Sequence, residues 1–244
     1  METNDKLVVL GVCAHPDDLD AGAGGTFAKW AKGGAECYYL ICTDGGNGGS
    51  GDVEPGTSAK RLTEMRKAEQ EDAGKIIGLK GVYFLDYKDT ELEPNRKLKR
   101  DIVYYIRKLK PDIVVTTDPT FIYSKYGFIN HSDHRAAGLA TIDAIYPLAK
   151  NAFAFEEFSK EGLAPHKVRS LYLINFTEGN EVVDISDTID LKIKAIEEHK
   201  TQALSKNAAM FRQFGVRIGE RSGLKYAESF TKIDFDRQFG SSDA

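Results

Sequence analysis

The stretch Lys6–Ala14 (KLVVLGVCA), which runs directly into His15-Pro16-Asp17-Asp18, sets the interpretation of the whole chain. Its apolar and β-branched side chains predict a strand that is covered on both faces. Similar short apolar runs recur along the chain. Further strands are therefore expected at Glu36–Thr43, Val82–Tyr87, Asp112–Thr117, Ser170–Phe176 and Glu181–Ile185.

Helical patterns separate these predicted strands. Helices are expected at Gly24–Lys32, Ser58–Ile77, Lys97–Leu109, Asp133–Tyr146 and Thr188–Lys200. The alternation of strand and helix predicts right-handed βαβ units. The fold class is therefore α/β, with a Rossmann-like, mainly parallel sheet and helices on both faces. No shift in composition marks a boundary, so residues 1–244 are expected to form a single domain.

Composition narrows the class of protein. The 244 residues carry 33 Lys and Arg against 37 Asp and Glu, a net charge of −4, which is not the basic balance of a nucleic-acid binder. The run Leu7–Ala14 is too short to cross a membrane, and the first six residues do not resemble a secretory signal. Three cysteines in apolar runs indicate reduced core thiols. We expect a cytoplasmic protein that acts on a small molecule, with no nucleic-acid or membrane partner, and a homo-oligomer stays open.

Polar residues gather where the predicted parallel strands end, and this is the edge at which open parallel sheets bind ligands. They are His15, Asp17 and Asp18 after the first strand, Asp44 after the second, Asp118 after the fourth, and His131-Ser132-Asp133-His134 at the start of the next helix.

Two of these groups contain side chains that commonly bind metals. His15 and Asp18 are three residues apart across a turn, and His131 and His134 are three apart at a helix start. Two imidazoles and a carboxylate suit a catalytic zinc site, while Asp17 beside them stays available as a general base. A lone His-x-x-His is common by chance, but two clusters at one sheet edge are a stronger indication. The residues alone also leave open a non-haem iron oxygenase with a His-x-Asp…His triad and a non-catalytic sugar-binding protein.

Four motifs, in this order, resemble the LmbE-like, or PIG-L, family of zinc-dependent N-deacetylases. They are Ala14-His15-Pro16-Asp17-Asp18, Gly24-Gly25-Thr26, Thr43-Asp44-Gly45 and His131-Ser132-Asp133-His134. Arg66-x-x-Glu69 and the segment Lys194–Gln202 add to the resemblance, which spans about Val8 to Gln202. It implies a hydrolase that removes an N-acetyl group from an N-acetylglucosamine-like or other amino-sugar conjugate.

The resemblance also implies roles for single residues. The Zn²⁺ ligands would be His15, Asp18 and His134. Asp17 would be the general base, and His131 would stabilise the oxyanion or assist the leaving amine. Candidate substrate-binding residues are Arg66, Asp44 and His199.

The sequence departs from the family pattern at two places. Leu19 follows the two aspartates where many members have Glu, and here the acid comes one residue later, at Asp20. Ile129 occupies a position where some members have Tyr, and Tyr123 or Tyr126 are the candidates to replace it. The glycine-rich segment Gly45–Gly51 does not match a phosphate-binding loop and is interpreted as a rim, or a lid, of the pocket.

Overall fold

A computed structural model describes residues 6–124, 127–176 and 179–235 of the chain. Seven strands form one sheet in the order β3-β2-β1-β4-β5-β7-β6. Their bounds are β1 (Val8–Cys13), β2 (Glu36–Thr43), β3 (Gly81–Tyr87), β4 (Ile113–Thr117), β5 (Ser170–Ile174), β6 (Glu181–Asp184) and β7 (Ala227–Asp234). Strands β1 to β5 pair in parallel, and β7 runs antiparallel to both β5 and β6. The predicted mainly parallel α/β sheet is confirmed.

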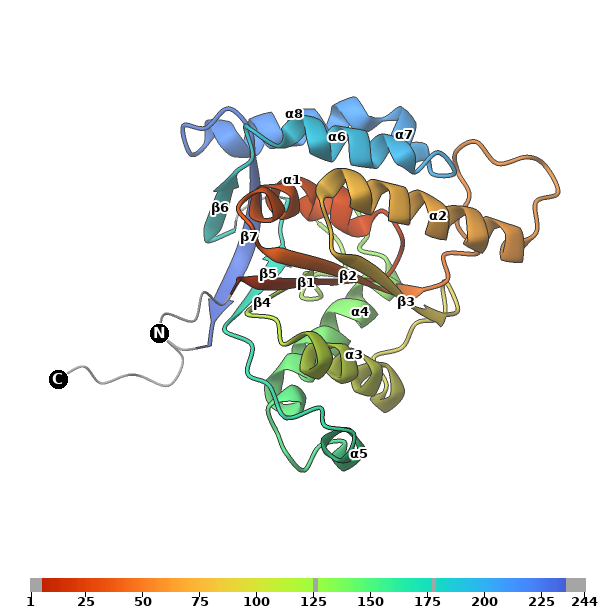
Figure 1. Cartoon of the computed structure of the whole chain (residues 1–244). Helices are drawn as coiled ribbons and strands as arrows, with labels where there is room; N and C mark the ends of the chain where they lie inside the picture. Colours follow the sequence, from red (N-terminus) through yellow and green to blue (C-terminus); the bar gives the residue numbers. More distant parts are fainter. Residues whose placement is uncertain (1–5, 125–126, 177–178, 236–244) are drawn as a thin grey trace.

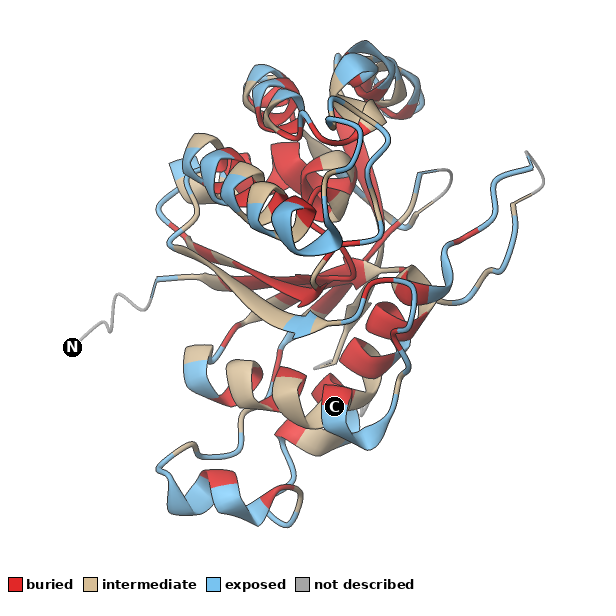
Figure 2. Ribbon diagram, turned by 90° about the vertical axis from the view of Figure 1, so that its right-hand side faces the viewer, coloured by how far each residue is buried: buried red, intermediate tan, exposed pale blue. Residues whose placement is uncertain are grey.

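Helices cover both faces of this sheet (Figure 1). One layer holds α1 (Asp18–Lys32), α2 (Ala59–Ile77), α6 (Ile189–Glu198), α7 (Ala203–Lys206) and α8 (Ala208–Glu220). The other holds α3 (Arg96–Leu109), α4 (Ser132–Asp143), the segment η1 (Ala144–Ala149), which continues α4 and is kinked at Tyr146, and α5 (Glu156–Lys160). Figure 2 shows that buried residues concentrate in the sheet and on the helix faces turned toward it.

Helix α1 begins six residues before the expected start at Gly24, directly after Asp17. The glycines of this stretch lie inside the helix, at positions where close packing requires them. A Cβ atom at Gly22 would lie 2.7 Å from Ile174 Cδ1, and one at Gly25 would lie 2.7 Å from Ile185 Cδ1. The glycines therefore let α1 approach β5 and the segment after β6.

The chain after residue 150 contains elements that the hydrophobic pattern does not predict, namely α5, α7, α8 and β7. Strand β7 lies between β5 and β6, and it buries a charged residue, Glu228. Lys192 Nζ lies 2.6 Å from Glu228 Oε1 and neutralises it. All three cysteines are free and buried, as expected. Within the described residues, no helix has the length and apolar character needed to cross a membrane.

Candidate active site

A cavity of about 290 Å³ opens at the edge where β1, β2, β3 and β4 end. It is lined by His15, Asp17, Asp18, Asn47, Gly48, Arg66, Asp89, Thr90, His131, His134 and Gln202. The structure thus brings together the five residues expected to bind metal or to react, with Arg66 beside them.

Ligand atoms of His15, Asp18 and His134 form a small triangle in this cavity, with both carboxylate oxygens of Asp18 at one corner. His15 Nδ1 lies 3.2 Å from His134 Nε2, and Asp18 Oδ1 lies 3.0 Å from the same nitrogen. The other oxygen, Asp18 Oδ2, lies 3.7 Å from His15 Nδ1. Zinc–ligand bonds of about 2.0–2.2 Å in tetrahedral geometry place ligand atoms about 3.3–3.5 Å apart. The spacing and the two-nitrogen, one-oxygen chemistry of this triangle fit a zinc ion.

The second nitrogen of His15 is held by two buried carboxylates. His15 Nε2 lies 3.0 Å from Asp89 Oδ1 and 3.3 Å from Asp133 Oδ2. Burial lowers the pKa of His15, but these hydrogen bonds outweigh it and raise the pKa to about 10. A carboxylate behind a metal-binding imidazole fixes its tautomer, so the pair keeps Nδ1 facing the triangle.

Each of these carboxylates is anchored by backbone amides. Asp133 accepts the N–H groups of Thr90 and Leu92 at 2.7 and 3.3 Å. Asp89 accepts the N–H groups of Asn47 and Gly48, both at 3.0 Å. The loops after β2 and β3 are therefore tied to the residues behind His15.

Asp17 lies beside the triangle and is paired with Arg66. Its Oδ2 lies 3.3 Å from Arg66 Nη2, and the same guanidinium donates to the carbonyls of Pro16 and Gly45 at 2.8 and 2.9 Å. Burial raises the pKa of Asp17 to about 6, and Asp18 adds to the rise, while Arg66 opposes it. This buried carboxylate is poised to exchange a proton near neutral pH.

His131 lies at the N-terminus of α4 with its ring close to both ligand histidines. Its ring centroid is 4.9 Å from that of His15 and 5.3 Å from that of His134. Its Nδ1 accepts the backbone N–H of Asp133 at 3.2 Å, so a neutral ring carries its proton on Nε2. Burial and the two nearby histidines lower the pKa of His131, which favours this neutral form.

Two residues expected to bind substrate lie elsewhere. Asp44 is not part of the cavity lining, and its Oδ1 accepts the N–H groups of Gly46 and Asp89 at 3.0 and 3.1 Å. His199 has no exposed surface, and its Nε2 lies 2.9 Å from Asp20 Oδ2. In this structure Asp44 orders a loop and His199 belongs to the protein interior.

The Gly45–Gly51 segment is fastened at its far end as well. The N–H of Gly51 donates to the carbonyl of Thr201 at 2.9 Å, and Asn47 donates to the carbonyl of Asp89 at 2.8 Å. These hydrogen bonds hold the segment in place as one wall of the cavity. Tyr123 is largely exposed and does not line the cavity, and Tyr126 lies outside the described residues.

Asn47 and Gly48 belong to the segment expected at the rim, whereas the sequence does not predict the three lining residues Asp89, Thr90 and Gln202. Asp89 comes two residues after β3, so the rule that parallel strands end at one edge would have indicated it. Gln202 lies in the segment that follows α6. Glu69 on α2 holds that segment by accepting from Thr201 N and Oγ1 at 2.9 and 2.6 Å.

Comparisons with known proteins agree with this geometry. Residues 10–145 match the model of a family described as GlcNAc-PI de-N-acetylase, PIG-L. Diacetylchitobiose deacetylase of Thermococcus kodakarensis is 34% identical over 229 residues, which cover 92% of this chain and 82% of that protein.

Two further similar proteins are also named deacetylases. A 1D-myo-inositol 2-acetamido-2-deoxy-α-D-glucopyranoside deacetylase of Rhodococcus erythropolis is 28% identical, with 83% of each chain covered. The solved structure of N,N′-diacetylchitobiose deacetylase from Pyrococcus horikoshii, bound to its inhibitor MPG, superposes with a TM-score of 0.83 at 30% identity. The superposition covers 94% of this chain and 84% of that one.

Proposed function

The chain belongs to the PIG-L family, and on this basis we propose that it is a zinc-dependent N-deacetylase of an N-acetylglucosamine-type substrate. The reaction adds water across the amide bond and releases acetate and a free amine. Similar relatives are named deacetylases of diacetylchitobiose and of an N-acetylglucosaminyl inositol, so the enzyme is an N-deacetylase of GlcNAc-type substrates.

One arrangement of residues is the main support for the proposal. A triangle of His15, Asp18 and His134 atoms with the dimensions of a zinc site lies next to a buried carboxylate, Asp17. Within the described residues, the ligand atoms of His15 also converge with those of His131 and His134, and with those of Asp89 and Asp133. Asp17 is paired with Arg66 instead, at 3.3 Å. A metal site with a free carboxylate beside it is the arrangement that amide hydrolysis requires.

In this proposal His15, Asp18 and His134 hold the zinc ion. Bound there, zinc supplies a Lewis acid that polarises the amide carbonyl and lowers the pKa of the attacking water to about 7. Asp89 and Asp133 set the tautomer of His15, so its Nδ1 would be available to hold the ion.

The residues around the metal carry out the proton transfers. Asp17 accepts a proton from the water as the water attacks the carbonyl carbon, and Arg66 orients its carboxylate. His131 donates a hydrogen bond from Nε2 to the developing oxyanion. The proton held by Asp17 then moves to the leaving nitrogen, directly or through His131, as the C–N bond breaks.

The cavity volume of about 290 Å³ is at the small end of ligand sites, which usually span about 300–1,000 Å³. This size suits one N-acetylated sugar unit, with the remainder of a conjugate extending into solvent. The wall carries hydrogen-bonding groups on several sides, from Asn47, Arg66, Asp89 and Gln202. We include in the proposal a small amino-sugar conjugate as substrate and a cytoplasmic location.

A screen for free amines tests the proposed function. Metal-free protein is reloaded with Zn²⁺ and incubated with N-acetylglucosamine, N,N′-diacetylchitobiose and an N-acetylglucosaminyl inositol. Free amine is measured with an amine-reactive dye, and the corresponding non-acetylated sugars give the background. We expect amine to form from at least one N-acetylated member. Stoichiometrically zinc-loaded protein that releases no amine from any of them would refute the proposal.

A further inference from the structure

Asp17 has a backbone conformation that its residue type rarely adopts. Its φ is 105°, in the left-handed region that favours glycine. Such a conformation persists only where its surroundings hold it. The backbone N–H of Asp17 donates to Gln70 Oε1 at 2.9 Å, and this contact reaches across from the middle of α2.

Gln70 is fully buried, and its amide orientation is fixed by its two partners. Because a backbone N–H can only donate, the side-chain oxygen of Gln70 must face Asp17. The amide nitrogen then points the other way, where it donates to Asp20 Oδ2 at 2.8 Å. Gln70 therefore links the backbone of Asp17 to a second carboxylate in the interior.

Asp20 accepts two more hydrogen bonds in the same pocket. His199 Nε2 lies 2.9 Å from Asp20 Oδ2, and Tyr39 Oη donates to Asp20 Oδ1 at 3.3 Å. Asp20, Tyr39 and His199 all have no exposed surface. Burial lowers the pKa of His199, but its bond to Asp20 outweighs burial and raises it, so the ring can carry the charge that balances the carboxylate.

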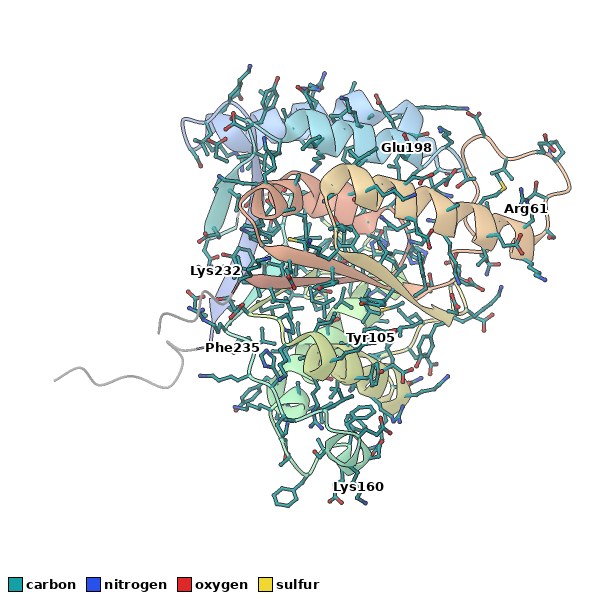
Figure 3. The ribbon with its side chains drawn as sticks, in the orientation of Figure 1. Arg61, Tyr105, Lys160, Glu198, Lys232 and Phe235 are labelled. Atoms are coloured by element: carbon teal, nitrogen blue, oxygen red, sulfur yellow. The ribbon has the colours of Figure 1, made fainter. Side chains whose placement is uncertain are left out.

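His199 reaches this position from the end of α6. Figure 3 shows Glu198, the residue before it, at the end of α6 above α2. Glu69 on α2 and Thr201 after α6 are joined by two hydrogen bonds, which fix the backbone next to His199. None of Gln70, Asp20 and His199 lines the cavity. Gln70 contacts the lining residue Asp17 directly, and the carbonyl of His199 also accepts the backbone N–H of the lining residue Gln202 at 2.9 Å.

We propose that Gln70, Asp20 and His199 are positioning residues, a buried chain of hydrogen bonds that holds Asp17 in its left-handed conformation and so directs its carboxylate at the reacting water. This inference rests on the proposed function, in which Asp17 is the general base. It assigns to His199 a role other than substrate binding. Loss of the chain lets the backbone of Asp17 relax, which misdirects the carboxylate without removing a group that touches the substrate.

The Gln70→Met variant tests the link nearest to Asp17. Methionine has a similar length and is apolar, but it cannot accept the N–H of Asp17. Thr188→Val is the matched control, because it also deletes a buried hydrogen bond between α1 and the start of α6, from Thr188 Oγ1 to the carbonyl of Gly25 at 2.8 Å. His199→Gln is the conservative variant, since its amide can still donate to Asp20.

Two readouts separate positioning from general stability. In zinc-loaded Gln70→Met we expect kcat to fall at least about tenfold, with KM and bound zinc within about twofold of wild type. Hydrogen exchange at the Asp17 amide, followed by NMR, should accelerate, while amides in α8 keep their wild-type rates. Thr188→Val should keep kcat within about twofold, and His199→Gln within about threefold.

Several results would overturn the inference. One is a Gln70→Met variant whose kcat, or whose Asp17 amide exchange rate, equals that of the wild type. Another is a fall in kcat in Thr188→Val or in His199→Gln that is as large as in Gln70→Met. A rise in KM with unchanged kcat would assign the network to substrate binding instead. If the wild type hydrolyses no N-acetylated sugar, the proposed function fails, and amide exchange at Asp17 still decides whether the chain of hydrogen bonds holds its backbone.

Discussion

Replacing Asp17 by asparagine should make the protein much less active and, without metal, more stable. Burial raises the pKa of this carboxyl from 3.8 to about 6 on folding. An acid whose pKa rises on folding destabilises the folded state once it is ionised, and this cost grows as the pH rises from about 4 through about 6. At pH 7 a rise of this size corresponds to roughly 3 kcal/mol of free energy of unfolding.

An asparagine side chain at this position avoids the cost because it carries no charge. Metal-free Asp17→Asn should therefore gain up to roughly 3 kcal/mol at pH 7, or at most about 6–12 °C in Tm for a chain of this size. The gain should shrink as the pH falls from about 6 and should vanish below about pH 4, where the wild-type carboxyl is protonated in both states. In the zinc-loaded enzyme the amide cannot accept a proton, so kcat should fall by about 10²–10⁴.

Thermal unfolding of metal-free protein across pH, together with kcat and zinc content of the loaded protein, measures these effects. Asp18→Asn is the matched control, because its expected change in stability has the opposite sign. Burial raises the pKa of Asp18, but His134 and His15 hold it well below its usual range. This variant should lose both stability at pH 7 and zinc. Activity of Asp17→Asn within about tenfold of wild type, or loss of its zinc, would refute the role of Asp17.

The remaining predictions concern the histidines. His134→Ala should lose tight zinc binding, because one corner of the ligand triangle is removed, and stoichiometric zinc in this variant by mass spectrometry would exclude His134 as a ligand. His131→Ala should keep its zinc while kcat falls about 10²–10³ with loss of the oxyanion donor. Near-wild-type kcat would contradict that role, and zinc loss would make His131 a ligand. Zinc binding should release protons and tighten as the pH rises from about 6 to 9, because the pKa of His15 is about 10 and that of His134 is raised when no metal is bound. Titration calorimetry in buffers of different ionisation enthalpy checks this, and heats independent of the buffer would contradict it.

Strands β1, β2 and β4 could be predicted because both of their faces are largely buried, which leaves apolar runs in the sequence. Strand β3 lies at the edge of the sheet and is only partly buried, but its run is still mostly apolar. The observed ends of these four strands at Cys13, Thr43, Tyr87 and Thr117 match the expected ones closely. Strand β7 could not be predicted in the same way. Its alternation is interrupted by the buried Glu228, whose partner Lys192 is 36 residues away in the sequence and becomes its neighbour only after folding.

The candidate site likewise combines residues that are close together in the sequence with residues that only folding brings together. His15, Asp17 and Asp18 are adjacent in the sequence, and His131 and His134 share a helix start, so spacing alone identifies both clusters. Asp89 and Gln202 have no such spacing. The family resemblance associates His199 with the substrate site, and the fold places this fully buried residue against Asp20, outside the residues that line the cavity.

Acetate release from the N-acetylated sugar that yields the most free amine in the screen, followed by proton NMR, tests most directly whether this site is a metal-dependent deacetylase. The protein is measured zinc-loaded, after removal of zinc by a chelator, and after zinc is restored. Zinc-loaded protein should convert N-acetyl groups into free acetate with an equal amount of amine, the metal-free form should be inactive, and restored zinc should bring the activity back. Acetate release that persists in protein verified to be free of metal would contradict the proposed role of His15, Asp18 and His134.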